Sequence, residues 1–182
     1  MTLLRRGMLG TVAGLLIVAG AAQAGGGGAP PSRQVVCAPG YVRPDFAALE
    51  RELAAARARW AGARPPTYWY DFEQVAAPVM FPPVRVAVGG GAVREVLPLV
   101  TDGGSPPPLA PATVEDRFEQ IAQTLILVRR QPCPVVEAEY DLRLGYPTRL
   151  YSGSGEANIA DGWGEWRVTN FSLLAEALPG RP

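Results

Sequence analysis

Histidine and lysine are both absent from this chain of 182 residues. Histidine is the usual base of nucleophilic triads and a common metal ligand, while lysine forms Schiff bases and holds phosphates in P-loops. The composition therefore excludes these kinds of site from the chain. Ser152 and Ser154 offer hydroxyls, but no evident base could activate them. The sequence favours a protein that is not an enzyme and needs no cofactor.

Cysteine is scarce, with only Cys37 and Cys133 in the chain. A single pair of cysteines in an oxidising compartment typically forms a disulfide, which here would close a loop of about 100 residues. The alternative is a reactive pair or a metal site, for which the chain has few soft ligands. We predict one disulfide, between Cys37 and Cys133.

Charged residues are sparse and the formal net charge is zero, but two arginines lie close to the N-terminus. Arg5 and Arg6 precede an apolar run, residues 8–22, and Ala22-Gln23-Ala24 provides a small-x-small cleavage site. The pattern predicts a signal peptide over residues 1–24, cleaved after Ala24. The alternative is an uncleaved N-terminal helix, for which the apolar run is short.

The mature chain would carry 15 arginines against 17 acidic residues, a net charge near −2. That balance argues against nucleic acid or an anionic membrane as the main partner. We expect a secreted, periplasmic or cell-envelope protein without a transmembrane anchor in its mature form. Residues 25–43 begin with a glycine run and predict a flexible lead-in, and residues 44–178 predict a single domain.

Two segments have apolar residues at spacings of three and four, which predicts two helices. The first spans residues 45–61, and the second begins at Thr113 with Asp116 in the position of a capping box. The apolar stripes are Phe46, Leu49, Leu53, Ala56 and Trp60 in the first, and Val114, Phe118, Ile121, Leu125 and Val128 in the second.

Period-two alternation predicts strands at residues 67–75, 84–88, 92–97 and 166–171, and two more within residues 135–152. Prolines at positions 78, 82 and 83 are expected to break the chain after the first strand, and Gly89-Gly90-Gly91 is expected to form a hairpin turn. The order is helix-strand-strand-strand-helix-strand-strand-strand. This order predicts an α+β fold, an antiparallel sheet of about six strands with two helices on one face.

The clearest hairpin is residues 135–152. If Asp141 lies opposite Pro147, then Glu139 faces Arg149, a favourable cross-strand pair. Gly145 can supply the positive φ that a tight connection needs, and the Asp141 carboxylate can accept backbone N–H groups from the residues after it. Tyr146 and Pro147 are expected to pack over that turn.

Several of these motifs together resemble a known family. They are Arg59-Trp60, the aromatic strand Tyr68-Trp69-Tyr70, the valine hairpin, the helix start Thr113-Val114-Glu115, and the element Tyr140-Asp141…Gly145-Tyr146-Pro147. The chain is similar over roughly residues 57–171 to the secreted bacterial proteins classified as domain of unknown function 6174. Tyr140, Asp141, Gly145, Tyr146 and Pro147 form the most specific part of the match. The resemblance implies a fold and a location outside the cytoplasm. The family has no established activity that could be carried over to this chain.

Acidic side chains gather on one face of the predicted hairpin, at Glu137, Glu139 and Asp141. The simplest interpretation is a solvated face paired in part with Arg143 and Arg149. An alternative is a site for calcium or another hard cation, completed by the loop residues Glu156, Asn158 and Asp161, although the spacing does not fit the calcium-loop consensus. A third hypothesis is a hydrolase that uses two carboxylates, which requires acids facing each other across a cleft.

The function that these observations favour is a non-catalytic binding or interaction domain. Tryptophan and tyrosine dominate binding hot spots, so Trp69, Tyr151 and Trp163 are the expected contact residues if they are exposed. The partner is expected to be another envelope or extracellular protein. The sequence does not identify it.

Overall fold

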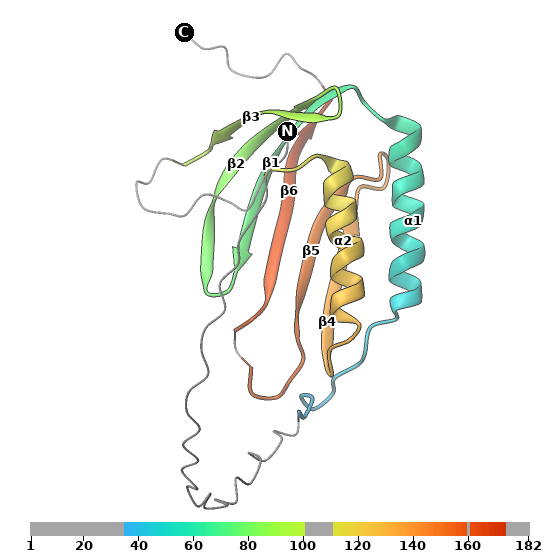
Figure 1. Cartoon of the computed structure of the whole chain (residues 1–182), viewed down its shortest axis with the longest axis vertical. Helices are drawn as coiled ribbons and strands as arrows, with labels where there is room; N and C mark the ends of the chain where they lie inside the picture. Colours follow the sequence, from blue (N-terminus) through green and yellow to red (C-terminus); the bar gives the residue numbers. More distant parts are fainter. Residues whose placement is uncertain (1–34, 101–110, 160, 174–182) are drawn as a thin grey trace, which may run out of the picture. The chain divides into compact units, whose positions relative to one another are not determined.

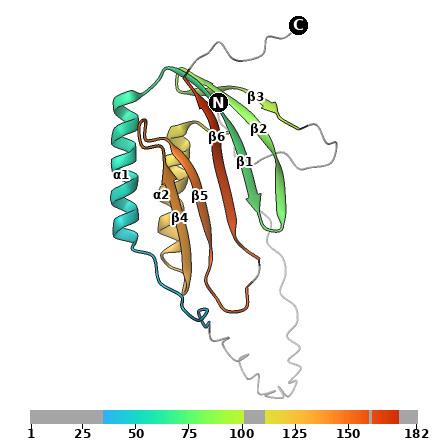
Figure 2. The same cartoon turned by 180° about the vertical axis from the view of Figure 1, so that it is seen from behind.

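The computed structural model describes residues 35–100, 111–159 and 161–173, so the predicted signal peptide, residues 1–24, lies outside the described residues. The elements are α1 (Phe46–Ala63), β1 (Thr67–Ala76), β2 (Val79–Gly89), β3 (Ala92–Pro98), α2 (Val114–Val128), β4 (Pro134–Tyr140), β5 (Pro147–Ser154) and β6 (Gly164–Ser172). The strands form one antiparallel sheet in the order β3-β2-β1-β6-β5-β4, with both helices on one face (Figures 1 and 2). The predicted fold class and element order are confirmed.

Each helix begins at a side chain that accepts a backbone hydrogen bond. Asp45 Oδ1 accepts from the Ala48 N–H at 3.0 Å at the start of α1. At α2 the capping box is present as predicted: the Asp116 N–H donates to Thr113 Oγ1 at 3.1 Å, and the Thr113 N–H donates to Asp116 Oδ2 at 2.9 Å. Local sequence therefore sets where both helices start.

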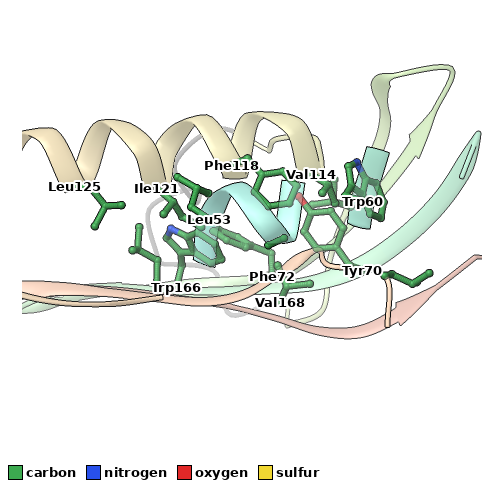
Figure 3. Close-up of a cluster of buried hydrophobic side chains, with 14 of the residues drawn as sticks. Leu53, Trp60, Tyr70, Phe72, Val114, Phe118, Ile121, Leu125, Trp166 and Val168 are labelled. Atoms are coloured by element: carbon green, nitrogen blue, oxygen red, sulfur yellow. The ribbon is translucent and has the colours of Figure 1, made fainter. Parts of the chain in front are cut away.

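The core lies between the helices and the covered face of the sheet. Figure 3 shows apolar side chains of α2 facing aromatic and aliphatic side chains of the strands. Every residue of the predicted apolar stripe of α2 is buried. In the predicted apolar stripe of α1, all residues are buried except Leu49, which is partly exposed. Tyr68, Tyr70 and Phe72 of β1 are all buried on the same face, because alternate residues of a strand point the same way.

The expectation that prolines break the chain after β1 is confirmed for Pro78, which lies in the turn between β1 and β2, and is wrong for Pro82 and Pro83. β2 begins at Val79 and continues through Pro82 and Pro83 to its glycine turn. Its pairing with β1 shifts register there, between Phe72 and Gln74, so neither proline is a paired position of the ladder. A bulge is a place where a strand tolerates residues that lack an N–H donor.

The register of the β4–β5 hairpin agrees with the prediction at one position and differs at another. Glu139 is paired with Arg149 as predicted. Asp141 does not lie opposite Pro147, because a register shift after Glu139 pairs Tyr140 with Pro147 instead. The shift takes Asp141 out of the ladder and into the turn, where its carboxylate accepts backbone hydrogen bonds.

The predicted disulfide joins Cys37 to Cys133, with a Cα–Cα distance of 5.6 Å. It attaches the described end of the lead-in to the residues just before β4. The Tyr41 hydroxyl donates to the Pro134 carbonyl at 2.8 Å, and the Arg43 guanidinium donates to the Arg129 carbonyl at 2.6 Å. Residues 35–43 are therefore anchored to the domain by covalent and polar contacts. Within the described residues, no helix is both long and apolar enough to cross a membrane.

Candidate functional site

The face of the sheet opposite the helices, here called the outer face, carries most of the residues that the sequence singled out. Strand alternation places on it Trp69, Asp71 and Glu73 of β1, Glu137 and Glu139 of β4, Arg149 and Tyr151 of β5, and Glu165 and Arg167 of β6. The charged members come mostly from β4, β5 and β6, which are neighbours in the sheet.

Arg149 is the centre of this charged group. Its Nε atom lies 2.7 Å from Glu165 Oε1, and its Nη1 atom lies 2.7 Å from Glu137 Oε2 and 2.9 Å from Glu139 Oε1. The Arg149 side chain is 19% exposed, whereas those of Glu137 and Glu139 are 58% and 59% exposed. These hydrogen bonds, above all the one to Glu165, raise the pKa of Arg149. The guanidinium links three strands and leaves two of its carboxylate partners open to solvent.

Glu165 is the most enclosed carboxylate of the group, at 17% exposure. Burial by itself raises its pKa, but hydrogen bonds from Arg149 and Arg167 outweigh that effect and hold the pKa of Glu165 below its ordinary value. Glu165 is therefore ionised at neutral pH. A carboxylate held in this way cannot deliver a proton as a general acid near pH 7.

The net charge of the outer face is negative. Apart from the Asp71–Arg85 ion pair, the outer-face positions of β1, β4, β5 and β6 carry two arginines, Arg149 and Arg167, and four glutamates, Glu73, Glu137, Glu139 and Glu165. Because Arg149 and Arg167 both already bind Glu165, the excess negative charge resides on exposed oxygens along β4 and on Glu73.

An aromatic pair borders this charged group. The rings of Tyr151 and Trp163 are stacked with their centroids 5.9 Å apart, and the Arg149 guanidinium lies 5.7 Å from the Tyr151 ring centre. Gly153 makes room for the pair, since a Cβ there would come within 3.0 Å of the Trp163 Cβ and 3.2 Å of the Tyr151 hydroxyl. Both aromatic side chains are half-buried, so they are less exposed than predicted.

A small pocket of about 110 Å³ opens beside Trp163. Its outer-face lining includes one aromatic residue, two carboxylates and one guanidinium: Trp163, Glu73, Glu165 and Arg167. Tryptophan is the best aromatic partner for a cation, and carboxylates are the natural partners of a guanidinium or ammonium group. The chemistry of this pocket suits the end of a basic side chain.

Trp69, the third predicted contact residue, belongs to a separate cluster at the other end of β1. The Arg85 guanidinium lies 4.1 Å from the centre of a Trp69 ring and binds both carboxylate oxygens of Asp71, at 2.6 and 3.0 Å. Asn170 Nδ2 adds a third hydrogen bond at 2.8 Å. Asp71 is 4% exposed. Trp69 therefore supports a buried ion pair and offers only part of its surface for binding.

Burial raises the pKa of Asp71, but the hydrogen bonds from Arg85 and Asn170 outweigh it, so the pKa of this carboxyl lies below its ordinary value. The Asp71 hydrogen bond in turn raises the pKa of Arg85. Both groups are charged throughout the neutral range. The cluster therefore acts as a fixed ion pair that connects β1, β2 and β6.

The residues named as cation ligands in the alternative hypothesis do not meet at one point. Glu137 and Glu139 bind the Arg149 guanidinium, and Asp141 Oδ1 accepts hydrogen bonds from the backbone N–H groups of Arg143 and Leu144 at 3.0 and 2.5 Å. Asp161 is exposed on the β5–β6 loop. Across residues 35–100, 111–159 and 161–173, no three histidine, cysteine, aspartate or glutamate side chains are grouped so that they could hold a metal ion.

The family-motif residues form the connection between β4 and β5. The Gly145 N–H donates to the Asp141 carbonyl at 3.0 Å, and the Asp141 N–H donates to the Tyr146 carbonyl at 2.9 Å. Gly145 has φ +84°, and a Cβ there would collide with the Ala56 carbonyl oxygen of α1. This glycine lets the turn lie directly against the helix.

The aromatic members of the motif pack against other parts of the core. The Tyr140 ring is stacked near Phe118 with centroids 6.3 Å apart, and the Tyr146 ring lies 4.0 Å from that of Phe171. Pro147 is fully buried. Tyr146 thus contacts the end of β6 rather than closing over the turn. The contacts of the motif are mainly structural.

Sequence reasoning missed a charged residue on the covered side of the sheet. Arg117 of α2 is 4% exposed, and its guanidinium carbon lies 3.7 Å from the centre of the Phe72 ring. Its Nη1 donates to Gln120 Oε1 at 3.0 Å, while Nε and Nη2 have no hydrogen-bond partner of ordinary geometry. Burial lowers the pKa of Arg117, which nevertheless stays protonated at neutral pH.

A signal for this position exists in the sequence. Arg117, Gln120 and Thr124 follow the helical spacing of three and four beside the apolar stripe. They place polar groups along the edge of α2 that faces the sheet. Gln120 and Thr124 line a cavity of about 170 Å³ between α2 and strands β1, β6 and β5.

Comparison with known proteins identifies a family. A family model described as "Family of unknown function (DUF6174)" matches residues 52–173. No curated protein and no solved structure matches the chain.

Proposed function

This chain belongs to the family of unknown function DUF6174, and we propose that it is a non-catalytic binding domain whose outer face holds a basic segment of a partner protein. The disulfide between Cys37 and Cys133 supports a location outside the cytoplasm, in the cell envelope or the extracellular space, because disulfides persist in oxidising compartments. The predicted signal peptide, residues 1–24, agrees with that proposal.

The observation that carries the proposal is the arrangement of charge around Arg149. Its carboxylate partners Glu137 and Glu139 are more than half exposed, so each still has oxygen atoms free to accept hydrogen bonds from a partner. Arg149 holds the two carboxylates in a fixed geometry, which lowers the entropy lost on binding. A basic segment lying across β4 to β6 would meet negative charge already in place.

The aromatic side of the face supplies a second contact. The pocket beside Trp163 has the aromatic and acidic lining that a lysine or arginine side chain requires. Rim carboxylates influence mainly the association rate and specificity, whereas a side chain seated against tryptophan contributes more to affinity. We therefore infer that the partner places one basic residue in this pocket and others near Glu137 and Glu139.

The two alternative functions have weaker support. A cation at Glu137 and Glu139 would have to compete with the Arg149 guanidinium, which already binds both carboxylates. A hydrolase with paired carboxylates needs one acid that can donate a proton across a cleft. Glu165 is held ionised by two arginines on an open sheet face, so it does not suit that role.

NMR titration locates the binding surface directly. Hexa-arginine is the probe and hexa-glutamate the control peptide, each added to uniformly ¹⁵N-labelled protein. We expect saturable shifts from hexa-arginine at outer-face amides of β4, β5 and β6 and at the Trp163 indole N–H, and none from hexa-glutamate. Shifts confined to the helices would contradict the proposal. Thermal melts with millimolar calcium and with a chelator test the cation alternative, which requires calcium to raise the melting temperature.

A further inference from the structure

The cavity between α2 and the sheet has a simple origin in the sequence. Ala76, Gly164 and Ser152 are paired across β1, β6 and β5, so three small residues lie in one row on the helix side of the sheet. In the next row toward the core, Gln74, Trp166 and Leu150 are paired across the same strands. The small row leaves space that the larger row does not fill, and the cavity measures about 170 Å³.

Polar groups without partners line this space. The Trp166 side chain is 3% exposed, yet its indole N–H has no hydrogen-bond acceptor, and the Gln74 Oε1 atom is buried without a donor. Figure 3 shows the indole nitrogen of Trp166 turned toward α2. Leaving a buried polar group without a hydrogen bond costs about 1–3 kcal/mol. A ligand atom that forms a hydrogen bond with either of these atoms would remove that cost.

The positive group near the cavity is the Arg117 guanidinium, whose carbon lies 5.5 Å from the centre of the Trp166 ring. Glu165 also contributes to the lining, but its carboxylate lies on the outer face, where Arg149 and Arg167 bind it. Gln120 lines the cavity, and its Oε1 atom accepts a hydrogen bond from the Arg117 guanidinium, so its amide N–H groups are available to another acceptor. Among the described residues, no carboxylate forms an ion pair with Arg117. A buried cation without a direct ion pair is unfavourable, so this part of the interior favours an anion.

We propose that this cavity is a binding site for a small organic carboxylate that also carries a hydroxyl or amino group. The carboxylate oxygens would accept from the Trp166 indole N–H and the Gln120 amide, and the hydroxyl or amino group would donate to Gln74 Oε1. Ser152 and Thr124 add hydroxyls to the lining. An apolar cavity of about 150 Å³ holds a benzene molecule, so the size suits a molecule of about six heavy atoms.

The cavity is distinct from the charged group around Arg149, although four of its lining residues, Gln74, Val75, Glu165 and Trp166, also line the pocket beside Trp163. It lies on the opposite side of the same strands, and its main polar groups come from α2 and from inward-facing positions of the sheet. The two proposals can be told apart because Glu137 and Glu139 belong to the outer face and do not line the cavity. The double variant Glu137→Gln/Glu139→Gln alters the outer face alone and leaves every group in the cavity in place.

The test uses lactate, with lactamide as its uncharged counterpart of nearly the same shape. The probe signal is the Trp166 indole N–H in a ¹H–¹⁵N spectrum, identified by its loss in Trp166→Phe. At constant ionic strength we expect lactate to shift this signal to saturation, and lactamide to bind at least tenfold more weakly. Equal effects of the two molecules, or no saturable shift with lactate, would overturn the proposal.

Variants separate a true site from an indirect effect. Gly164→Val fills the cavity and should abolish the lactate shift, and Arg117→Met should weaken lactate binding at least tenfold. If Gly164→Val does not fold, Gly164→Ala replaces it, because a Cβ at Gly164 comes no closer than 3.6 Å to its nearest neighbour, the Val75 carbonyl oxygen. Unchanged lactate affinity in the folded Gly164 variant and in Arg117→Met would also overturn the proposal. The outer-face double variant serves as the control and should bind lactate with wild-type affinity.

Discussion

The Nε atom of Arg149 and the Oε1 atom of Glu165 lie 2.7 Å apart and join β5 to β6. The Nη1 atom of the same guanidinium reaches two glutamates on β4. Isolated surface ion pairs contribute little to stability, but a guanidinium shared by three carboxylates is a network with a defined geometry. Its consequence is a fixed acidic surface on the side of the sheet that the helices leave uncovered.

The turn between β4 and β5 gives the first test of the structural part of this account. Asp141→Ala removes the acceptor for the N–H groups of Arg143 and Leu144. The free energy of unfolding should fall by about 1 kcal/mol, as for other lost capping hydrogen bonds. Urea unfolding measures it. Asp141→Asn keeps an oxygen at the same place and should recover most of the loss, and an unchanged stability of Asp141→Ala would show that the carboxylate does not cap the turn.

Gly145 and Gly91 form a matched pair for testing the contact of that turn with α1. Both have positive φ, +84° and +73°, but a Cβ at Gly145 would collide with the Ala56 carbonyl oxygen, whereas a Cβ at Gly91 meets no atom within 4 Å. Alanine at Gly91 should cost about 1 kcal/mol for backbone strain alone. Alanine at Gly145 should cost clearly more, about 3 kcal/mol or above. Equal losses in urea unfolding would mean that the turn does not press against the helix.

The disulfide should contribute strongly to stability because it closes a long loop. Cys37 and Cys133 are 96 residues apart in the sequence. The chain-entropy estimate for such a loop is about 4.7 kcal/mol, and removal of native disulfides typically costs about 2–5 kcal/mol. The Cys37→Ser/Cys133→Ser variant should unfold at lower urea concentration than the oxidised protein. A reducing agent should shift the wild-type curve toward the variant and leave the variant unchanged, and no shift in either would contradict the assignment.

Acid should weaken the ion pair between Asp71 and Arg85. The pKa of Asp71 is lowered in the folded protein, so its stabilisation is fully present above the unfolded pKa, about 4, and is lost as pH falls through the folded value. At pH 7 Asp71→Asn should be less stable than wild type by about 1–3 kcal/mol. That difference should shrink below pH 4. Asp161→Asn, at an exposed loop position, is the control and should match wild type at each pH. A pH-independent difference for Asp71→Asn would contradict the assigned charge state.

Much of the fold follows from local pattern in the sequence. The apolar stripe of α2 and its capping box were both predictable, because helical spacing and capping are properties of a few neighbouring residues. Glu139 facing Arg149 followed from the same kind of reasoning, since a two-residue period and a short turn restrict the register. The exact pairing beyond Glu139 did not follow, because the bulge depends on how Asp141 is used in the turn.

The features of the candidate sites needed tertiary information. The row of Ala76, Gly164 and Ser152 exists only because β6 lies between β1 and β5. The local periodicity of the sequence does not predict the order of strands in the sheet. Arg117 borders the apolar stripe of α2 in the sequence, but its burial was not expected, since arginine is rarely buried without a partner. Its burial results from the position of Phe72 beneath it. Functional sites are where such departures from local rules are expected.

The most direct test of the central claim compares two double variants with the same change in net charge. Glu137→Gln/Glu139→Gln removes two carboxylates from the outer face, and Glu50→Gln/Glu119→Gln removes two from the helices, where they pair with Arg129 and Arg57. Calorimetry with hexa-arginine should show an affinity about fivefold weaker for the first variant, as expected for the loss of two exposed charge contacts. The second variant should retain wild-type affinity. Equal weakening in both variants would show that the peptide responds only to net charge, and it would contradict a binding site on the outer face.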